Sequence, residues 1–327
     1  MESEIRGRVA SSSFAYPTMG IILLGGISDK IHRYPLHTSA GIAYTGIEEK
    51  IRVETEFLVR EGKQSGYVNG VELPATSDNR SPFSIINRYS ELLSNKLQAG
   101  KDEKISFSSI NRGIISGSSD GAAAAVGKCL EDIIPYEVSI YDMENELRVI
   151  SESVGRSIYG GLTITEGRGG PVFTEKLLDE SAFRDYAIVG CKFSSSRHPS
   201  DDIHVNIVKS PAYPGRISDA ELKGRELRAL ADERDIKGIF DLAMRDTDQY
   251  HRLIESVGVN VITPAMRGFI EEITNLRRET WASYIVTGGT NVFVPVEKKN
   301  IKEVVNLASK LKIEVVPLKV SGGASTF

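Results

Sequence analysis

A loop rich in glycine and serine, set between a strand-like run and an alanine-rich segment, constrains the fold of this chain more than any other feature. The strand-like run covers residues 104–111, the loop starts at Gly113, and alanines fill 122–125. Small residues at such a junction leave the backbone N–H groups of a helix N-terminus uncovered, and the helix dipole adds partial positive charge there. The stretch Gly113–Lys128 therefore predicts a loop that binds the phosphates of a nucleotide.

Two other motifs overlap this loop. A P-loop needs a hydroxyl side chain after Gly-Lys to hold magnesium, but Cys129 follows Gly127-Lys128, so this motif is rejected. The nucleophile elbow G-x-S-x-G is matched by residues 117–121, with Ser119 as the nucleophile. A serine hydrolase and a plain turn capped by Ser or Asp therefore remain alternatives to the phosphate loop. The hydrolase would complete its triad with Asp241 and His251.

Composition limits the class of protein. The chain has 327 residues and a net charge of −4, without a basic stripe, so we expect it to bind neither nucleic acid nor an anionic membrane. No apolar stretch reaches the roughly 18 residues needed to span a bilayer, and the N-terminus has no apolar signal sequence. Cys129 and Cys191 lack redox or ligand spacing, and the five histidines form no metal-site pair. We therefore expect a cytoplasmic protein without a structural metal.

Hydrophobic patterns divide the chain into two lobes. Residues 51–59 alternate between apolar and polar side chains, as in a half-buried strand, whereas an apolar strand at Tyr186–Phe193 is followed by long helical patterns. We predict a mixed α/β (α+β) protein with an N-terminal lobe at 1–184 and a C-terminal lobe at 185–327. Other expected strands are 20–24, 39–44, 162–165, 283–286, 292–296 and 313–320, and expected helices are 81–97, 142–155, 219–234, 236–254, 263–278 and 299–311.

Four polar residues are candidates for substrate chemistry. Glu152 and Arg156 are four residues apart at the end of the predicted helix 142–155, so they share a face, either as a surface ion pair or as a pair in a cleft. In a cleft, the arginine would hold a carboxylate and the glutamate would position a hydroxyl or bind magnesium. Arg197 follows a buried strand in an expected polar loop, where binding residues concentrate. Thr287 starts Thr-Gly-Gly-Thr-Asn, which suits a hairpin or a close backbone approach to a ligand.

Several short segments occur along this chain in the order found in one superfamily. The glycine–serine loop resembles the phosphate loop of the GHMP small-molecule kinases. The segments 15–18, 35–41, 153–161, 199–200 and 287–291 look like those of its diphosphomevalonate decarboxylase branch. The resemblance covers about residues 15 to 295. It implies a two-lobed fold, with an N-terminal lobe similar to ribosomal protein S5 and a ferredoxin-like C-terminal lobe.

Two departures from the decarboxylase pattern indicate which members of the branch this chain resembles. The decarboxylases carry Lys-Tyr-Trp-Gly-Lys-Arg where this chain has Leu23-Leu-Gly-Gly-Ile-Ser28, so the cations that would pair with a diphosphate are missing. Their catalytic aspartate is replaced by Thr287, which cannot act as a base near neutral pH. This double change is similar to the archaeal mevalonate 3-kinases. These enzymes phosphorylate the tertiary 3-hydroxyl of mevalonate in an alternative mevalonate pathway of isoprenoid biosynthesis.

The resemblance implies a role for each candidate residue. Glu152 and Thr287 would orient the hydroxyl, so that catalysis depends on orientation rather than proton abstraction. ATP and Mg²⁺ would be the cofactors, mevalonate or a similar 3-hydroxy-3-methyl carboxylate the substrate, and a homodimer the assembly. A phosphorylated-mevalonate decarboxylase and a mevalonate-3-phosphate 5-kinase are the alternatives. Substrate binding is expected of Leu23, Ser116, Arg156 and Arg197, and ATP or magnesium binding of Gly113, Gly117, Ser118, Ser119 and Asp120.

Overall fold

Two mainly antiparallel β-sheets form the framework of the protein. The computed structural model describes residues 7–74, 80–197 and 200–327. The first sheet has the strand order β13-β1-β4-β7-β5-β6, and all its neighbours are antiparallel except β5 and β7. Its strands are β1 (Arg8–Ala15), β4 (Arg52–Glu61), β5 (Gly66–Val68), β6 (Val71–Leu73), β7 (Glu103–Arg112) and β13 (Ser325–Thr326).

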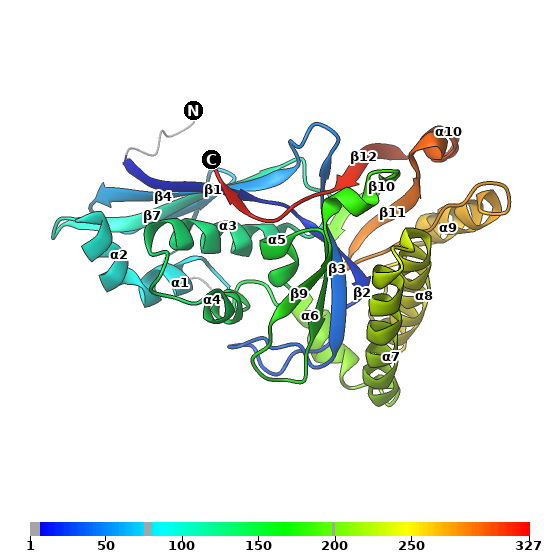
Figure 1. Ribbon diagram of the computed structural model, residues 1–327, viewed down its shortest axis with the longest axis horizontal. Coiled ribbons are helices and arrows are strands. Elements are labelled where there is room, and N and C mark those ends of the chain that lie inside the picture. Colours follow the sequence, from blue (N-terminus) through cyan, green and yellow to red (C-terminus); the bar gives the residue numbers. More distant parts are fainter. Residues whose placement is uncertain (1–6, 75–79, 198–199) are drawn as a thin grey trace.

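Helices cover one face of the first sheet. The alternating residues of β4 bury Val53 and Phe57, and α3 packs against β1 and β4 below them (Figure 1). Three of the alanines of α3, Ala123, Ala124 and Ala125, are fully buried, because a helix with small side chains can approach a sheet closely. The helices on this side are α1 (Phe83–Arg88), α2 (Ser90–Leu97), α3 (Ser118–Ile133), α4 (Ile140–Leu147) and α5 (Gly155–Tyr159).

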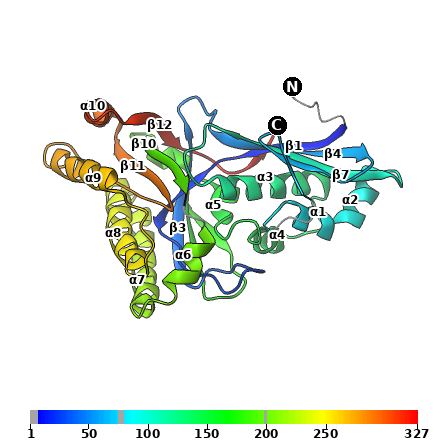
Figure 2. The same cartoon turned by 180° about the vertical axis from the view of Figure 1, so that it is seen from behind.

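The second sheet has the order β11-β10-β12-β3-β8-β9, with β2 paired to β3 off this path. The helices α7 and α8 pack against each other and against β2 and β3, while α9 and α10 lie at the far end (Figure 2). The strands are β2 (Thr18–Ile22), β3 (Thr38–Gly46), β8 (Leu162–Glu166), β9 (Thr174–Leu178), β10 (Tyr186–Arg197), β11 (Gly289–Glu297) and β12 (Glu314–Val320). The helices are α6 (Ser200–Ile207), α7 (Tyr213–Asp232), α8 (Ile236–Glu255), α9 (Pro264–Leu276) and α10 (Ile301–Lys310).

Strand pairing connects residues on both sides of the predicted boundary at 185. Strand β12 pairs with β3, with Leu318 opposite Gly46, and the C-terminal strand β13 returns to pair with β1. Figure 1 shows this last segment crossing from the second sheet to the first, where Ser325 and Thr326 pair with Phe14 and Ser13 near the end of β1. The division into lobes at 185 stays a prediction. No helix among the described residues is both long enough and apolar enough to cross a membrane.

Several expected elements differ from the structure. The expected strand 283–286 has only isolated bridges, at Ala282 and Ile285, and the expected helix 81–97 is divided into α1 and α2. The predicted helix 142–155 ends at Leu147. The buried guanidinium of Arg148, which is ion-paired with Glu144, donates to the Glu152 carbonyl oxygen at 2.5 Å and so stabilises a bend in place of further helical turns. This contact bends the chain through residues 148–154 before the short helix α5 begins. The expected polar loop 194–202 is replaced by the end of β10 and the start of α6, while residues 198–199 lie outside the described part.

Candidate active site

The start of α3 opens onto a cavity, as the phosphate-loop pattern predicts. Gly117 is the N-cap residue, with a φ of 74°, and no side chain caps the helix there. A Cβ atom at Gly117 would lie 2.1 Å from the Thr18 carbonyl oxygen, so only glycine allows the loop to approach β2 this closely. Tyr44 Oη donates to the Ser116 carbonyl oxygen at 2.6 Å, and Asn291 Nδ2 donates to the Ile115 carbonyl oxygen at 3.2 Å. The second sheet therefore holds the loop from below.

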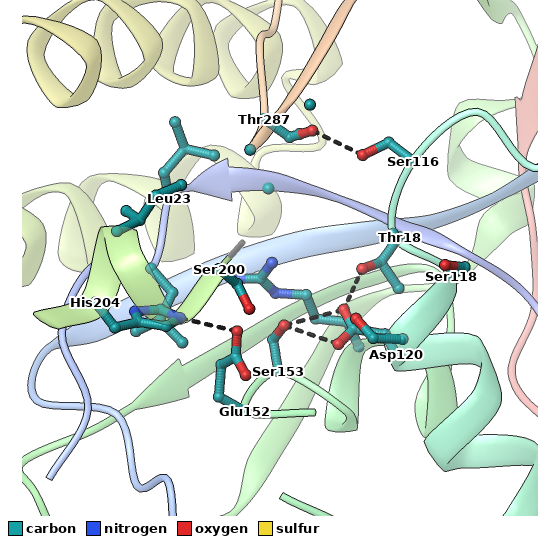
Figure 3. A pocket seen from close by; sticks show the side chains of 18 of the residues that line it. Thr18, Leu23, Ser116, Ser118, Asp120, Glu152, Ser153, Ser200, His204 and Thr287 are labelled. Atoms are coloured by element: carbon teal, nitrogen blue, oxygen red, sulfur yellow. Dashed lines mark hydrogen bonds and ion pairs between the residues drawn. The ribbon is translucent and has the colours of Figure 1, made fainter. Parts of the chain in front are cut away.

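A cavity of about 420 Å³ adjoins this helix end, and Figure 3 shows its side chains. Nine of the predicted site residues line it: Leu23, Ser116, Gly117, Ser118, Ser119, Asp120, Glu152, Arg156 and Thr287. Gly113 does not line it and is exposed. Strand pairing puts the backbone of Arg197 opposite Gly289, which does line it, and the Arg197 side chain lies outside the described part.

Asp120 is a buried carboxylate in the first turn of α3. It accepts hydrogen bonds from Ser151 Oγ at 2.5 Å, from Ser153 Oγ at 2.9 and 3.0 Å, and from the Thr18 hydroxyl. Ser151 Oγ also contacts Ser119 Oγ at 3.2 Å. A negative charge at this position is favoured by the helix dipole. The result is a cluster of oxygen atoms beside the expected phosphate site (Figure 3).

Glu152 lies on the bend that follows α4, where it meets groups from three other segments. Its Oε2 accepts from Arg33 Nη2 at 2.9 Å and lies 3.7 Å from Arg80 Nη2, while its Oε1 lies 2.9 Å from His204 Nε2. Burial opposes ionisation of this carboxyl, but its interactions with His204, Arg33 and Arg80 outweigh burial and hold its pKa well below the usual range. Glu152 is therefore a charged, fixed acceptor and a very weak base.

The two arginines also bind Asp201 on α6. Arg33 Nη2 donates to Asp201 Oδ1 at 2.6 Å and Arg80 Nη1 donates to the same oxygen at 3.1 Å. Arg33 is 1% exposed, and its backbone has a φ of 58°, which is unfavourable for a residue with a side chain. Such strain is found where surrounding contacts fix a residue for function.

Arg156 presents an unpaired cationic nitrogen. Its side chain is buried against β3, where a Cβ atom at Gly41 would lie 2.6 Å from Arg156 Cδ. Nη2 is buried and has no hydrogen-bond partner among the residues that the structure describes. Burial lowers the pKa of this guanidinium, although Asp120 and Glu152 act in the opposite direction. A buried donor without a partner is unfavourable, so this atom is a natural binding point for an anionic group.

The remaining wall of the cavity is hydroxylic on one side and apolar on the other. Thr287 Oγ1 lies 3.1 Å from Ser116 Oγ, which links the segment before β11 to the loop before α3. Leu23 supplies an apolar side chain to the same wall (Figure 3). The other apolar lining residues are Leu24, Ile203 and Tyr250.

The structure does not assemble the serine hydrolase triad. Ser119 contacts Ser151, whereas Asp241 accepts from Arg277 Nη2 at 2.5 Å and from Trp281 Nε1 at 3.3 Å. His251 Nε2 instead lies 2.9 Å from the Val286 carbonyl oxygen. Neither Asp241 nor His251 lines the cavity.

Several residues of this site were missed from the sequence: Thr18, Arg33, Arg80, Ser153, Asp201 and His204. The tripeptide Ser-Glu-Ser at 151–153 is the one local signal that could have indicated Ser153. Arg33 is 119 residues from Glu152 in the chain, and His204 is 52 residues from it. No spacing rule connects residues so far apart.

Fold and site together define a small-molecule kinase-like protein of the GHMP superfamily. A model for the diphosphomevalonate decarboxylase-like N-terminal domain matches residues 15–170, and a model for the mevalonate-3-kinase C-terminal domain matches residues 198–302. The chain is 44% identical over 308 residues to the mevalonate-3-kinase of Picrophilus torridus, covering 94% of each chain. It is 44% identical over 312 residues to the mevalonate 3-kinase of Thermoplasma acidophilum, covering 95% of this chain and 96% of that one. The chain belongs to the mevalonate-3-kinase family.

Solved structures agree with this assignment. The T. acidophilum mevalonate-3-kinase with mevalonate 3-phosphate and ADP bound superposes with a TM-score of 0.90 at 41% identity, over 98% of this chain and 99% of that one. The mevalonate diphosphate decarboxylase of Staphylococcus aureus superposes with a TM-score of 0.79 at 18% identity, over 97% of each chain. At 18% identity, the likeness to the S. aureus decarboxylase shows a shared fold alone.

Proposed function

We propose that this protein transfers the γ-phosphoryl group of ATP to the 3-hydroxyl of (R)-mevalonate, giving mevalonate 3-phosphate and ADP. The relatives that are 44% identical over nearly the full chain support this assignment. The observation in the structure that carries it is the distribution of charge in the cavity. The α3 N-terminus and its hydroxyls lie at one end, Arg156 offers one unpaired donor, and the wall at Leu23 is apolar.

The carboxylate of the substrate would bind to Arg156. Its planar guanidinium can face a carboxylate with two parallel N–H donors, and one of its nitrogens is already desolvated and without a partner. We keep Arg197 as a second contact to the same carboxylate. The branched carbon skeleton of mevalonate would then lie against Leu23 and Leu24, where it needs no polar partner.

The 3-hydroxyl would be oriented by Glu152, with Thr287 beside it. Two donors of Arg33 occupy Glu152 Oε2, whereas Oε1 has one partner among the described residues, His204, and so retains a lone pair for a hydroxyl proton. The low pKa of Glu152 makes early proton abstraction unfavourable. Phosphoryl transfer passes through a loose transition state that depends on alignment, so an oriented but still protonated hydroxyl suffices.

The start of α3 fits the phosphates of ATP together with a magnesium ion. Its uncapped N-terminus suits anions, and Ser118, Ser119 and Asp120 supply the hard oxygen atoms that magnesium prefers. When bound, Mg-ATP supplies the phosphoryl group and neutralises the charge that develops on it. The chain's own contribution is to hold the hydroxyl of the substrate in line with that group.

The charge distribution disfavours the two alternatives from the same superfamily. A decarboxylase for mevalonate diphosphate or a 5-kinase for mevalonate 3-phosphate must bind a further multiply charged group, and Leu23, Leu24 and Ile203 offer it no pairing partner. Thr287 also lacks the charge of a catalytic aspartate. We further propose a cytoplasmic homodimer, with lobes at 1–184 and 185–327, that serves an alternative mevalonate pathway of isoprenoid biosynthesis.

The test is incubation with Mg-ATP and (R)-mevalonate, with measurement of ADP and CO₂ and with phosphorus NMR to locate the new phosphate. Phosphate on C3 with no CO₂ is the expected result. CO₂ release from a 5-phosphorylated or diphosphorylated mevalonate, without turnover of mevalonate, would identify a decarboxylase instead.

A further inference from the structure

His204 lies between the two sides of the cavity and contacts both. It is 4% exposed, and its Nε2 lies 2.9 Å from Glu152 Oε1. The backbone N–H of Gly26 donates to His204 Nδ1 at 3.0 Å. A backbone N–H can only donate, so Nδ1 is unprotonated and the ring proton is on Nε2. His204 therefore donates to Glu152 while it accepts from Gly26.

The Gly26 end of this contact belongs to the segment 23–26, whose Leu23 and Leu24 line the apolar wall and which several hydrogen bonds hold in place. The N–H of Leu23 donates to Asp246 Oδ2 at 2.7 Å, and Arg216 Nη2 donates to the Leu23 carbonyl oxygen at 2.6 Å. Gly26 has a φ of 94°, and a Cβ atom there would lie 2.1 Å from the Tyr213 hydroxyl. Tyr250 Oη donates a hydrogen bond to the Leu24 carbonyl oxygen, and Tyr213 Oη donates one to the Gly25 carbonyl oxygen. The N–H of Gly25 donates to His37 Nε2.

The Glu152 end is held by the same helix that carries His204. Asp201, one turn earlier on α6, binds the two arginines that contact Glu152 Oε2. Without His204, Oε2 would still be held, but Oε1 would lose its one fixed partner and the carboxylate could turn. Oε1 is also the oxygen with a lone pair left for the hydroxyl of the substrate.

We propose that His204 is a positioning residue that sets the distance between the hydroxyl acceptor, Glu152 Oε1, and the apolar wall at Leu23. This inference rests on the proposed function, because the two groups that His204 connects are those that would contact the reacting hydroxyl and the carbon skeleton. Through one imidazole ring, a change on either side of the cavity is transmitted to the other. The role differs from that of a buried structural histidine, which would affect folding and leave the kinetic constants alone.

Two substitutions separate the two contacts. The amide of His204→Asn occupies the place of Nδ1, so it keeps an acceptor for Gly26 and loses the donor to Glu152. The amide of His204→Gln occupies the place of Nε2, so it keeps the donor to Glu152 and loses the acceptor for Gly26. We expect His204→Asn to lower kcat at least about tenfold with a small change in the KM for mevalonate. We expect His204→Gln to raise that KM about tenfold with a smaller change in kcat.

The measurements are steady-state ADP release with varied mevalonate and with varied ATP, and thermal unfolding of each variant. The matched controls are His32→Asn and His32→Gln, at an exposed histidine outside the cavity, which should leave all constants unchanged. If both His204 variants keep wild-type kcat and KM while only their unfolding temperature falls, His204 is structural and the proposal is wrong.

A second readout does not depend on activity. Long-range proton–nitrogen NMR of protein labelled with ¹⁵N-histidine should show a neutral ring with its proton on Nε2 whose signals are missing from the spectra of both His204 variants, whereas those of His251, whose Nε2 faces the Val286 carbonyl oxygen, remain. A proton on Nδ1, or on both nitrogens, would exclude the contact with Gly26 and overturn the proposal. If the wild-type protein has this tautomer but forms no mevalonate 3-phosphate, the proposed function is wrong. The mevalonate affinities of the two variants, compared with that of the wild-type protein, then decide whether His204 is a positioning residue.

Discussion

At the scale of single residues, Glu152 is the group on which the proposed reaction depends most. We expect Glu152→Gln to lower kcat about 100-fold, because the amide presents an uncharged and differently directed acceptor to the hydroxyl. The fold should persist, since Arg33 keeps its ion pair with Asp201. ADP release and circular dichroism measure these two effects. The control is Glu166→Gln, the same change in an exposed ion pair, which should leave kcat unchanged. An unchanged kcat in Glu152→Gln would contradict the role of Glu152 in orienting the hydroxyl.

Arg156 allows a test of carboxylate binding. Arg156→Lys keeps the charge but loses the planar fork, so we expect the KM for mevalonate to rise about tenfold or more while the KM for ATP stays constant. An analogue with an alcohol in place of the carboxylate should be phosphorylated equally poorly by both proteins. Arg228→Lys, on the surface, controls for the substitution. A larger effect on ATP than on mevalonate would place Arg156 with the nucleotide instead.

At the scale of elements, the approach of the phosphate loop to β2 can be tested at two glycines. Gly117 and Gly113 have φ values of 74° and 60°, so alanine is strained at either position by about 1–2 kcal/mol. At Gly117 the new methyl group would also collide with the Thr18 backbone, whereas at Gly113 the nearest atom is 3.4 Å away. We expect Gly117→Ala to lose clearly more free energy of unfolding in urea and to raise the KM for ATP. Equal effects in the two variants would argue that Gly113 also belongs to the ATP site, as predicted from the sequence.

How far the sequence allowed prediction also becomes clear at this scale. The strand at β7 and the loop into α3 were predicted because a local pattern of glycine, serine and alanine determines them. Glu152 and Arg156 were chosen for a shared helix face that does not exist, since the chain bends between α4 and α5. They still line one cavity, because the bend turns both side chains inward. The arginines and His204 around Glu152 could not be predicted, since their contacts arise from packing of distant segments.

At the scale of the whole molecule, the two sheets make the lobes depend on each other. A fragment of residues 1–184 would lack β12, the partner of β3, and β13, the partner of β1. We expect this fragment to show no cooperative thermal unfolding, since it would expose an apolar edge of β3 to water. Calorimetry of the purified fragment and of the full chain measures this. A sharp transition in the fragment would show that the lobe predicted at 1–184 folds independently.

Stability against acid is also a property of the whole molecule, and His37 should contribute a distinct part of it. Burial, together with the charge of Arg216, lowers the pKa of His37 from 6.5 to about 4. Its Nε2 accepts the N–H of Gly25 and its Nδ1 lies 2.7 Å from the Thr38 carbonyl oxygen, so a further proton has no acceptor. Because the unfolded chain binds this proton more tightly, the stabilisation is complete above pH 6.5 and is lost as the pH falls towards 4.

The lowered pKa corresponds to roughly 3 kcal/mol of unfolding free energy across that window. His37→Gln keeps an acceptor for Gly25 but does not titrate, so its unfolding free energy should fall less steeply between pH 6.5 and 4. Part of the slope should remain, because burial also lowers the pKa of His251. Glu152 and Asp246, whose pKa values are depressed, add losses at more acidic pH in both proteins. Urea unfolding at a series of pH values measures the unfolding free energy of the wild-type protein and of His37→Gln. If the two plots of unfolding free energy against pH are parallel, His37 already carries a proton in the folded state.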